Sequence, residues 1–387
     1  MHSLDQFAQD WLDRREANNL RRAVTETAPS DGIFVIRKGR RLLSFCSNDY
    51  LNLTQHPALK QAAKEAIDRF GVGAGASRLI TGSHPLYTEL EARLARLKGT
   101  EAACVFGSGY LANSGIIPAL AGEGDLIVAD ELAHSCIRTG MSLSGAELAL
   151  FRHNDVTHAR EILAARREQY RHTLLVTEGV FSMDGDLAPL EELAELAGQY
   201  DAWLMTDDAH GIGVLGDGRG SSFAGGRAIP VPLQMGTLSK AIGGYGGYLC
   251  ASKAVIELMQ NRARTMIYST GLPPATIAAA IAALEVIERD PAYAAQPLQK
   301  AQSFTALTNL PRATSPIVPL LIGDSDKTMT AAKLLEDEGF LVVGIRPPTV
   351  PEGTARLRFT FTALHDDRDI ARVANIVRER IIERNRD

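Results

Sequence analysis

The chain reads Thr237-Leu238-Ser239-Lys240-Ala241-Ile242-Gly243-Gly244-Tyr245-Gly246-Gly247 between two short, mostly apolar segments. These flanking segments, residues 232–235 and 248–251, have the length and composition of buried strands. The loop between them offers one amine, two hydroxyl groups and, at its glycines, uncovered backbone N–H groups. A surface lysine beside a flexible turn would have the same local sequence. The role of Lys240 therefore depends on what the rest of the chain brings near it.

Short apolar segments alternate with helical patterns through residues 100–251. The expected strands are Ala102–Phe106, Leu126–Ala129, Leu148–Phe151, Thr173–Val176, Trp203–Thr206 and Gly247–Ala251. Helical patterns such as Thr157–Arg171 and Pro189–Tyr200 lie between most of them. Strands connected through helices predict an α/β fold with a large, doubly wound, mostly parallel sheet covered on both faces. Ligands of such sheets bind beyond the carboxyl ends of the strands.

The sequence patterns divide the chain into three regions. Residues 1–48 form an N-terminal arm, with an amphipathic helix over 4–22 and a hairpin over 32–47. Residues 49–289 form the large domain, and residues 290–387 form a small C-terminal α+β domain. The helices expected outside the alternating region are Pro57–Phe70, His84–Lys98, Thr276–Arg289, Thr328–Gly339 and Asp366–Asn385. The strands expected in the third region are Ile317–Ile322, Leu341–Ile345 and Ala355–Thr362.

Composition narrows the class of protein. Of the 387 residues 45% are apolar, which is ordinary for a globular chain. The net charge of −5 argues against a surface that binds nucleic acid or an anionic membrane. Four separated cysteines show no zinc-ribbon or C-x-x-C spacing, and the N-terminal segment lacks the apolar core of a signal peptide. We expect a reduced, cytoplasmic protein whose Cys104 and Cys250 are buried.

Polar residues follow several of the expected strands. Gly109 and Tyr110 open a helix, and a helix N-terminus of this kind binds anions. His134 follows the second strand, and Ser182 lies in the polar segment after Thr173–Val176. Asp207 and His210 follow Trp203–Thr206, where a carboxylate directly after a buried strand needs partners. A purely structural hydrogen-bond network is the alternative explanation.

Three other site types match the motifs less well. Gly211-Ile212-Gly213-Val214-Leu215-Gly216 has the spacing of a dinucleotide-binding loop, but the following residues are too rich in glycine to continue as its helix. A metal site at the acidic and histidine residues would lack a second compact cluster of ligands. Gly107-Ser108-Gly109 lacks the earlier glycine of a serine nucleophile elbow.

Pyridoxal phosphate requires the groups that these strand ends offer together. Its aldehyde needs an amine, its pyridine nitrogen a carboxylate, its ring a flat stacking partner, and its phosphate N–H or hydroxyl donors. Lys240, Asp207, His134 and the turn at Gly109 supply one group of each kind. We therefore expect a pyridoxal-phosphate enzyme that uses no metal.

The chain resembles the α-oxoamine synthases, pyridoxal-phosphate enzymes with the aspartate-aminotransferase-like fold, called fold type I. The resemblance extends from Arg21 to the last helix. It is carried by Ser47-Asn48-Asp49-Tyr50-Leu51, Thr177-Glu178-Gly179-Val180-Phe181-Ser182-Met183-Asp184-Gly185, Asp207-Asp208-Ala209-His210-Gly211 and Thr237-Leu238-Ser239-Lys240.

The resemblance implies a role for each matching residue. Lys240 would bind the cofactor covalently and later move protons at the substrate Cα, Asp207 would bind the pyridine nitrogen, and His134 would stack on the ring. The residues implied around the cofactor are Gly109, Tyr110, His134, Ser182, Asp207, His210, Thr237, Ser239, Lys240 and, from the neighbouring subunit of a homodimer, Thr270. The residues implied around the substrates are Arg21, Asn48, Thr349 and Arg358. Of these, Arg358 would pair with the amino-acid carboxylate.

The C-terminal stretch Ile345–Pro351 with Gly353–Arg358 is most similar to family members of biotin biosynthesis. These members condense L-alanine with a pimeloyl thioester and release 8-amino-7-oxononanoate, CO2 and the free thiol carrier. The resemblance implies this acyltransferase reaction. Another member reaction, such as that of glycine C-acetyltransferase, 5-aminolevulinate synthase or serine palmitoyltransferase, stays open, as does the choice between CoA and acyl carrier protein.

Overall fold

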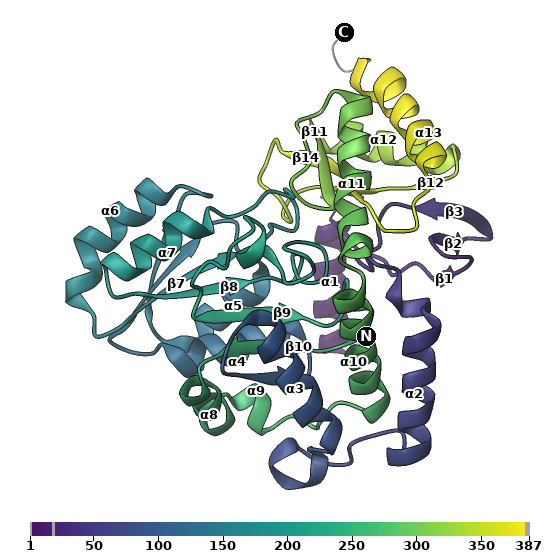
Figure 1. The fold of residues 1–387 in the computed structure, drawn as a ribbon. Coiled ribbons are helices and arrows are strands. Elements are labelled where there is room, and N and C mark those ends of the chain that lie inside the picture. Colours follow the sequence, from purple (N-terminus) through teal and green to yellow (C-terminus); the bar gives the residue numbers. More distant parts are fainter. Residues whose placement is uncertain (1, 18–19, 384–387) are drawn as a thin grey trace.

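The computed structural model describes residues 2–17 and 20–383, and its largest feature is a seven-stranded sheet (Figure 1). The strands lie in the order β4-β10-β9-β8-β7-β5-β6. Their bounds are β4 Ala102–Phe106, β5 Leu126–Asp130, β6 Glu147–Phe151, β7 Thr173–Glu178, β8 Trp203–Asp207, β9 Leu233–Thr237 and β10 Gly247–Ala251. Neighbouring strands are parallel except at β10, which runs antiparallel to β4 and β9. The predicted α/β fold with a mostly parallel sheet is confirmed.

Helices cover both faces of this sheet, so its strands are buried on both sides. The side chains of β4 show this most simply: Cys104 and Phe106 belong to one apolar cluster, whereas Ala103 and Val105 belong to another. The helices of the first face are α4 Gly109–Leu120, α5 Ser135–Ser144, α8 Lys253–Arg262 and α9 Arg264–Ile267. Those of the opposite face are α2 Pro57–Phe70, α3 Pro85–Lys98, α6 Val156–Arg166, α7 Leu190–Gln199 and α10 Pro274–Arg289. Cys104 and Cys250 are buried, as predicted.

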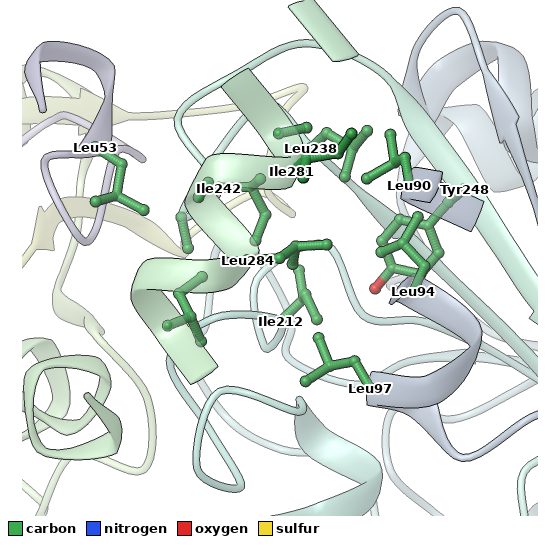
Figure 2. Close-up of a cluster of buried hydrophobic side chains, with 14 of the residues drawn as sticks. Leu53, Leu90, Leu94, Leu97, Ile212, Leu238, Ile242, Tyr248, Ile281 and Leu284 are labelled. Atoms are coloured by element: carbon green, nitrogen blue, oxygen red, sulfur yellow. The ribbon is translucent and has the colours of Figure 1, made fainter. Parts of the chain in front are cut away.

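The loop that carries Lys240 is anchored in this core. Leu238 and Ile242, on either side of the lysine, are fully buried in a cluster with Ile281 and Leu284 of α10 (Figure 2). Leu94 of α3 belongs to the same cluster. Apolar burial on both sides of Lys240 therefore holds the loop in place, although the loop has no regular secondary structure.

Two smaller sheets lie at the other end of the molecule (Figure 1). One has the order β11-β14-β13, with bounds β11 Ile317–Gly323, β13 Val343–Ile345 and β14 Ala355–Thr360. The other has the order β1-β2-β3-β12, with bounds β1 Thr27–Pro29, β2 Phe34–Arg37, β3 Arg40–Ser44 and β12 Phe340–Leu341. The helices beside them are α11 Pro291–Thr308, α12 Ser325–Asp337 and α13 Asp367–Val377, which a π-helical turn over Arg378–Ile382 extends. Of these helices, α11 was not predicted from the sequence.

One strand expected in this region is wrong as a single element. The stretch Leu341–Ile345 is split, because Leu341 pairs with Ser44 of β3 while residues 343–345 pair with β14. The same pairing joins the N-terminal hairpin to the C-terminal region. The division into an arm, a large domain and a small domain stays a prediction.

The N-terminal helix is shorter than expected. α1 covers Ser3–Ala17, residues 20–22 are irregular, and residues 18–19 lie outside the described part of the chain. Its apolar side chains are exposed, with Leu4, Phe7 and Trp11 at 73%, 66% and 48%. Within residues 2–17 and 20–383, no helix is both long and apolar enough to cross a membrane.

Candidate active site

The register of the large sheet brings its polar strand ends together. Glu178 at the end of β7 pairs with Asp207 at the end of β8, and Asp207 pairs with Met235 of β9. Thr237, two residues farther, ends β9 and leads into the loop with Lys240. Residues separated by tens of positions therefore meet at one edge of the sheet, as expected for parallel strands.

Lys240 reaches a buried histidine at this edge. Its Nζ lies 2.8 Å from Nε2 of His210, and Nδ1 of His210 lies 2.6 Å from the hydroxyl oxygen of Tyr50. Tyr50 and His210 are 0% and 4% exposed. The loop needs glycine for this arrangement at Gly243, where φ is +69° and a Cβ would lie 2.8 Å from the backbone of Leu53.

Burial favours a neutral amine on Lys240 and a neutral His210. Burial lowers the pKa of Lys240, and Asp207 and Glu178 oppose this effect. Burial also lowers the pKa of His210 well below its ordinary value, and the positive charges of Lys240 and Arg358 act in the same direction. A lysine with a lowered pKa is the form that acts as nucleophile or general base near neutral pH.

Asp207 is a buried carboxyl group held by two hydrogen bonds. It is 5% exposed, its Oδ2 accepts a 2.7 Å hydrogen bond from Nδ2 of Asn113, and its Oδ1 accepts one from the N–H of Ala209 at 3.0 Å. Asn113 lies in α4 and is fully buried. Asn113 was not predicted as a site residue, although a polar residue inside an apolar helix one turn after the Gly109 loop is a usable signal.

His134 presents its ring at the N-terminus of α5. The residue is exposed, its Nδ1 lies 2.9 Å from Sγ of Cys136, and its N–H donates to Oε1 of Glu178 at 2.7 Å. Burial raises the pKa of Glu178 well above its ordinary value, and the charge of Asp207 adds to this. The backbone contact with Glu178 fixes His134 beside the Asp207 edge while its ring stays accessible to a flat ligand. Glu178 and Cys136 were not predicted as site residues.

The N-terminus of α4 approaches the end of β9. A Cβ on Gly109 would lie 3.4 Å from Cβ and Oγ1 of Thr237, so the two segments are close at this point. The Thr237 hydroxyl lies 2.8 Å from that of Ser239 and donates to the carbonyl of Gly246. The first N–H groups of α4, apart from that of Leu111, which Ser108 caps, are available to an anion here. Tyr110 is half exposed and bonds to Thr139 instead.

A buried arginine of the small C-terminal sheet, Arg358, contacts two other predicted site residues, Ser182 and Asn48. Arg358 of β14 is 4% exposed, its Nε donates to the carbonyl of Ser182, and its terminal nitrogens lie 3.3 and 3.4 Å from Oδ1 of Asn48. Its neighbour in the strand register, Arg356, pairs with Asp184. The small C-terminal sheet thus holds the Ser182 segment, and the positive charge of Arg358 acts to lower the pKa of both Lys240 and His210.

Three predicted site residues lie apart from this cluster. Arg21 is exposed and pairs with Glu16, and Thr349 is exposed in a turn after the cis bond between Pro347 and Pro348. Thr270 is exposed and pairs with Ser77 in an isolated bridge. The described contacts bring none of the three to Lys240, so their roles stay predictions.

A cavity of about 870 Å³ lies at the other edge of the sheet. Its wall includes Trp203 and Leu233, the first residues of β8 and β9, together with Ala251, the last residue of the antiparallel β10. These are the strand ends opposite Asp207 and Thr237. The cavity is therefore separate from the Lys240 cluster.

A protonated histidine, His153, connects the end of β5 with the segment that follows Ser182. Nδ1 of His153 lies 3.1 Å from Oδ1 of Asp130, and its Nε2 lies 2.8 Å from Oδ2 of Asp186. Burial alone would lower the pKa of His153, but the hydrogen bonds and charges of the two carboxylates raise it to about 10. His153 is thus a cation bridging two carboxylates over the neutral pH range.

Replacing His153 with glutamine is expected to destabilise the protein most at low pH. Because its folded pKa of about 10 lies above the unfolded value of about 6.5, the stabilisation is complete below pH ~6.5 and is lost as pH rises through 10. At pH 6 we expect a loss of about 1.5–3 kcal/mol, the range for hydrogen bonds to a charged group. Urea unfolding of wild type and variant from pH 6 to 10 measures this difference.

The control for this experiment is His172→Gln, because His172 stacks on Trp203 instead of bridging carboxylates. Its effect on stability should show little dependence on pH in this range. A His153→Gln penalty that stays constant or grows toward pH 10 would contradict the charged bridge.

Comparisons with known proteins agree with this geometry. Residues 40–377 match the family described as aminotransferase class I and II. An 8-amino-7-oxononanoate synthase of Methylocella silvestris is 65% identical over 345 residues, which cover 89% of this chain and 98% of the relative. A serine palmitoyltransferase variant from S. paucimobilis, solved with bound PLP–myriocin aldimine, superposes with a TM-score of 0.91 at 27% identity over 98% of both chains. An 8-amino-7-oxononanoate synthase structure from Francisella tularensis gives 0.76 at 26% identity over 89% of this chain and 98% of that one.

Proposed function

The chain belongs to the aminotransferase class I and II family, and from this premise we propose that it is a pyridoxal-phosphate-dependent acyltransferase of biotin biosynthesis. It condenses L-alanine with a pimeloyl thioester and releases 8-amino-7-oxononanoate, CO2 and the free thiol carrier. The single observation that carries the proposal is the Lys240–His210–Asp207 cluster in a chain 65% identical to a synthase of that name. The family also implies small-molecule substrates.

The residues present fit pyridoxal phosphate. Lys240 offers an amine of lowered pKa, and the buried Asp207, oriented by Asn113, offers a carboxylate for the pyridine nitrogen. The exposed ring of His134 offers a stacking face. Gly109 lets the N-terminus of α4 approach Thr237 closely, which leaves backbone N–H groups for the phosphate. When bound, the cofactor supplies an electron sink for the carbanion formed at the substrate Cα.

The chain's own residues then bind and move protons. Arg358 pairs with the carboxylate of alanine, and Asn48 shares its position beside the guanidinium. Lys240 takes the Cα proton at Nζ, which requires the free amine that burial favours, and returns a proton at Cα after CO2 leaves. Asp207, held by its two hydrogen bonds, would face the pyridine nitrogen of the bound cofactor and favour the protonated form of that nitrogen. His210 and Ser182 border the same space.

We further propose that the enzyme acts as a cytoplasmic homodimer. The exposed apolar residues Leu4, Phe7 and Trp11 of α1, together with Tyr268 beside Thr270, support a partner surface. Thr270 is exposed and has no described contact with the cluster of its own chain, which is consistent with a contact to the phosphate bound by the neighbouring subunit. Arg21 and Thr349 contact the acyl thioester in this proposal.

A substrate panel tests the proposed reaction. Thiol release is measured with alanine, glycine or serine against acetyl, succinyl, pimeloyl and palmitoyl thioesters, each on CoA and, for pimeloyl, also on acyl carrier protein. Alanine with a pimeloyl thioester is expected to give the highest kcat/KM, because one missing or additional methylene group in an apolar pocket changes kcat/KM by only about 10–200-fold, whereas these donors differ by several such groups.

The outcome that overturns the proposal is a preference for glycine with the acetyl thioester, which would assign glycine C-acetyltransferase activity. A preference for serine with the palmitoyl thioester would assign the activity named for the S. paucimobilis structure. Mass spectrometry of the product and of released CO2 confirms that alanine and the acyl group are joined with loss of one carbon.

A further inference from the structure

A tyrosine outside the predicted site residues completes a chain of hydrogen bonds to the lysine. The hydroxyl oxygen of Tyr50 lies 2.6 Å from Nδ1 of His210, and Nε2 of the same ring lies 2.8 Å from Nζ of Lys240. Tyr50 is 160 residues from His210 in sequence and is 0% exposed. The three side chains come from three separate segments, so the arrangement exists only in the folded chain.

The protonation of each member defines the direction of these bonds. Burial raises the pKa of Tyr50 to about 12, so its hydroxyl keeps a proton to donate. The other acceptor near this hydroxyl, Oδ1 of Asn48, lies 3.4 Å away and already faces the donors of Arg358. Nδ1 of His210 is therefore the acceptor of the short bond. Because His210 is neutral, its single N–H is then on Nε2.

We propose that Tyr50 is a positioning residue whose hydroxyl donates to Nδ1 of His210 and thereby fixes the tautomer with the proton on Nε2, facing Lys240. An Nε2–H group donates to Nζ only when Nζ has a free lone pair, so this tautomer favours the free amine of Lys240. This inference deepens the proposed function. Only its consequence for catalysis rests on that function: by fixing the His210 tautomer, Tyr50 keeps Lys240 available as the base.

Other titratable groups also act on Lys240 and must be held constant. They are Asp207, Glu178, Cys136, Arg358 and His134, whose Nδ1 accepts from the N–H of Cys136. A Tyr50→Phe substitution removes one oxygen and leaves all of these side chains in the protein, although Arg358 loses its interaction with the Tyr50 hydroxyl. The matched control is Tyr248→Phe, because the Tyr248 hydroxyl is also fully buried but has no hydrogen-bond partner among the described residues.

The test uses the full-length chain without cofactor. Nitrogen-15 NMR of labelled histidines, with the His210 signals assigned by their loss in His210→Gln, reports the tautomer. Competitive amine labelling followed by mass spectrometry reports the free-amine fraction of Lys240 at neutral pH. In wild type we expect a protonated Nε2. In Tyr50→Phe we expect Lys240 labelling to fall about threefold to tenfold, the range that one hydrogen bond supports, with no fall in Tyr248→Phe.

Two outcomes overturn the proposal. One is a wild-type His210 that carries its proton on Nδ1, a result that needs no variant and stands even where Tyr50→Phe fails to fold. The other is a folded Tyr50→Phe protein with unchanged tautomer and unchanged Lys240 labelling. Neither measurement uses substrate or cofactor, so the result is independent of whether the substrate panel supports the proposed reaction.

Discussion

Lys240→Ala is expected to abolish turnover, with a loss of at least about 10³-fold in kcat. The amine is the only lysine nitrogen that the described contacts place beside both His210 and the Asp207–Glu178 carboxylates. Alanine removes both the group that would bind the cofactor covalently and the base that would take the Cα proton. Positioned general bases alone contribute about 10²–10⁴-fold, and loss of covalent attachment adds to that.

The measurement combines thiol-release kinetics with the visible absorption of the cofactor-loaded protein. Wild type should show a band that borohydride bleaches, and the reduced protein should carry the label on the Lys240 peptide. The control is Lys253→Ala, which alters an exposed lysine at the start of α8. A Lys240→Ala protein that keeps both activity and the bleachable band would disprove the assignment.

Lys98→Met is expected to lower the free energy of unfolding by about 3–5 kcal/mol. Nζ of Lys98 lies 2.9 Å from Oδ2 of Asp208, and the two side chains are 0% and 1% exposed. Lys98 also donates to the carbonyl of Arg219, and Asp208 accepts from the N–H of Ser221. Methionine keeps the volume of the side chain but leaves a buried carboxylate without its cation, which is the costly case for an ion pair.

Urea unfolding measures this loss as a shift of the midpoint at constant slope. The double variant Lys98→Met/Asp208→Asn should recover part of the stability, because it removes the unpaired charge together with its partner. As a surface control, Arg368→Ala breaks the exposed pair with Asp366 and should leave the midpoint unchanged. A Lys98→Met midpoint equal to that of the surface control would show that the buried pair contributes nothing.

The sequence predicted most of the large sheet because its signals are local. Apolar segments of four or five residues between helical patterns mark β4, β5, β6, β7, β8 and β10 to within two residues at each end. Parallel strands align their carboxyl ends, so the polar residues after them, including Asp207 and Lys240, were expected to meet. The structure places Asp207, His210, His134 and Lys240 at one edge of the sheet for this reason.

Elements whose form depends on a distant partner were not predictable in the same way. The apolar stretch Leu341–Ile345 has the pattern of one strand, yet it divides between two sheets because β3 and β14 offer separate edges. α1 covers Ser3–Ala17 and residues 20–22 are irregular, so the helix is shorter than the one expected over residues 4–22. The residue types along a stretch show whether it is apolar or amphipathic. Where the element ends, and which sheet it joins, depends on the neighbouring surfaces that the fold provides.

The sequence by itself determined most of the sheet and the strand ends that carry polar residues, and it predicted Lys240 as the reactive lysine. The sheet follows from periodicity, and the prediction for Lys240 follows from the groups at the other strand ends and from the family resemblance. Only the tertiary structure decided that Asn113 holds Asp207 and that Tyr50 reaches His210, across 94 and 160 residues. The same holds for the neutral state of His210 and the lowered pKa of Lys240. Hydrogen bonds and desolvation act through space over a few ångströms, and the distances on which they depend exist only once the chain has folded.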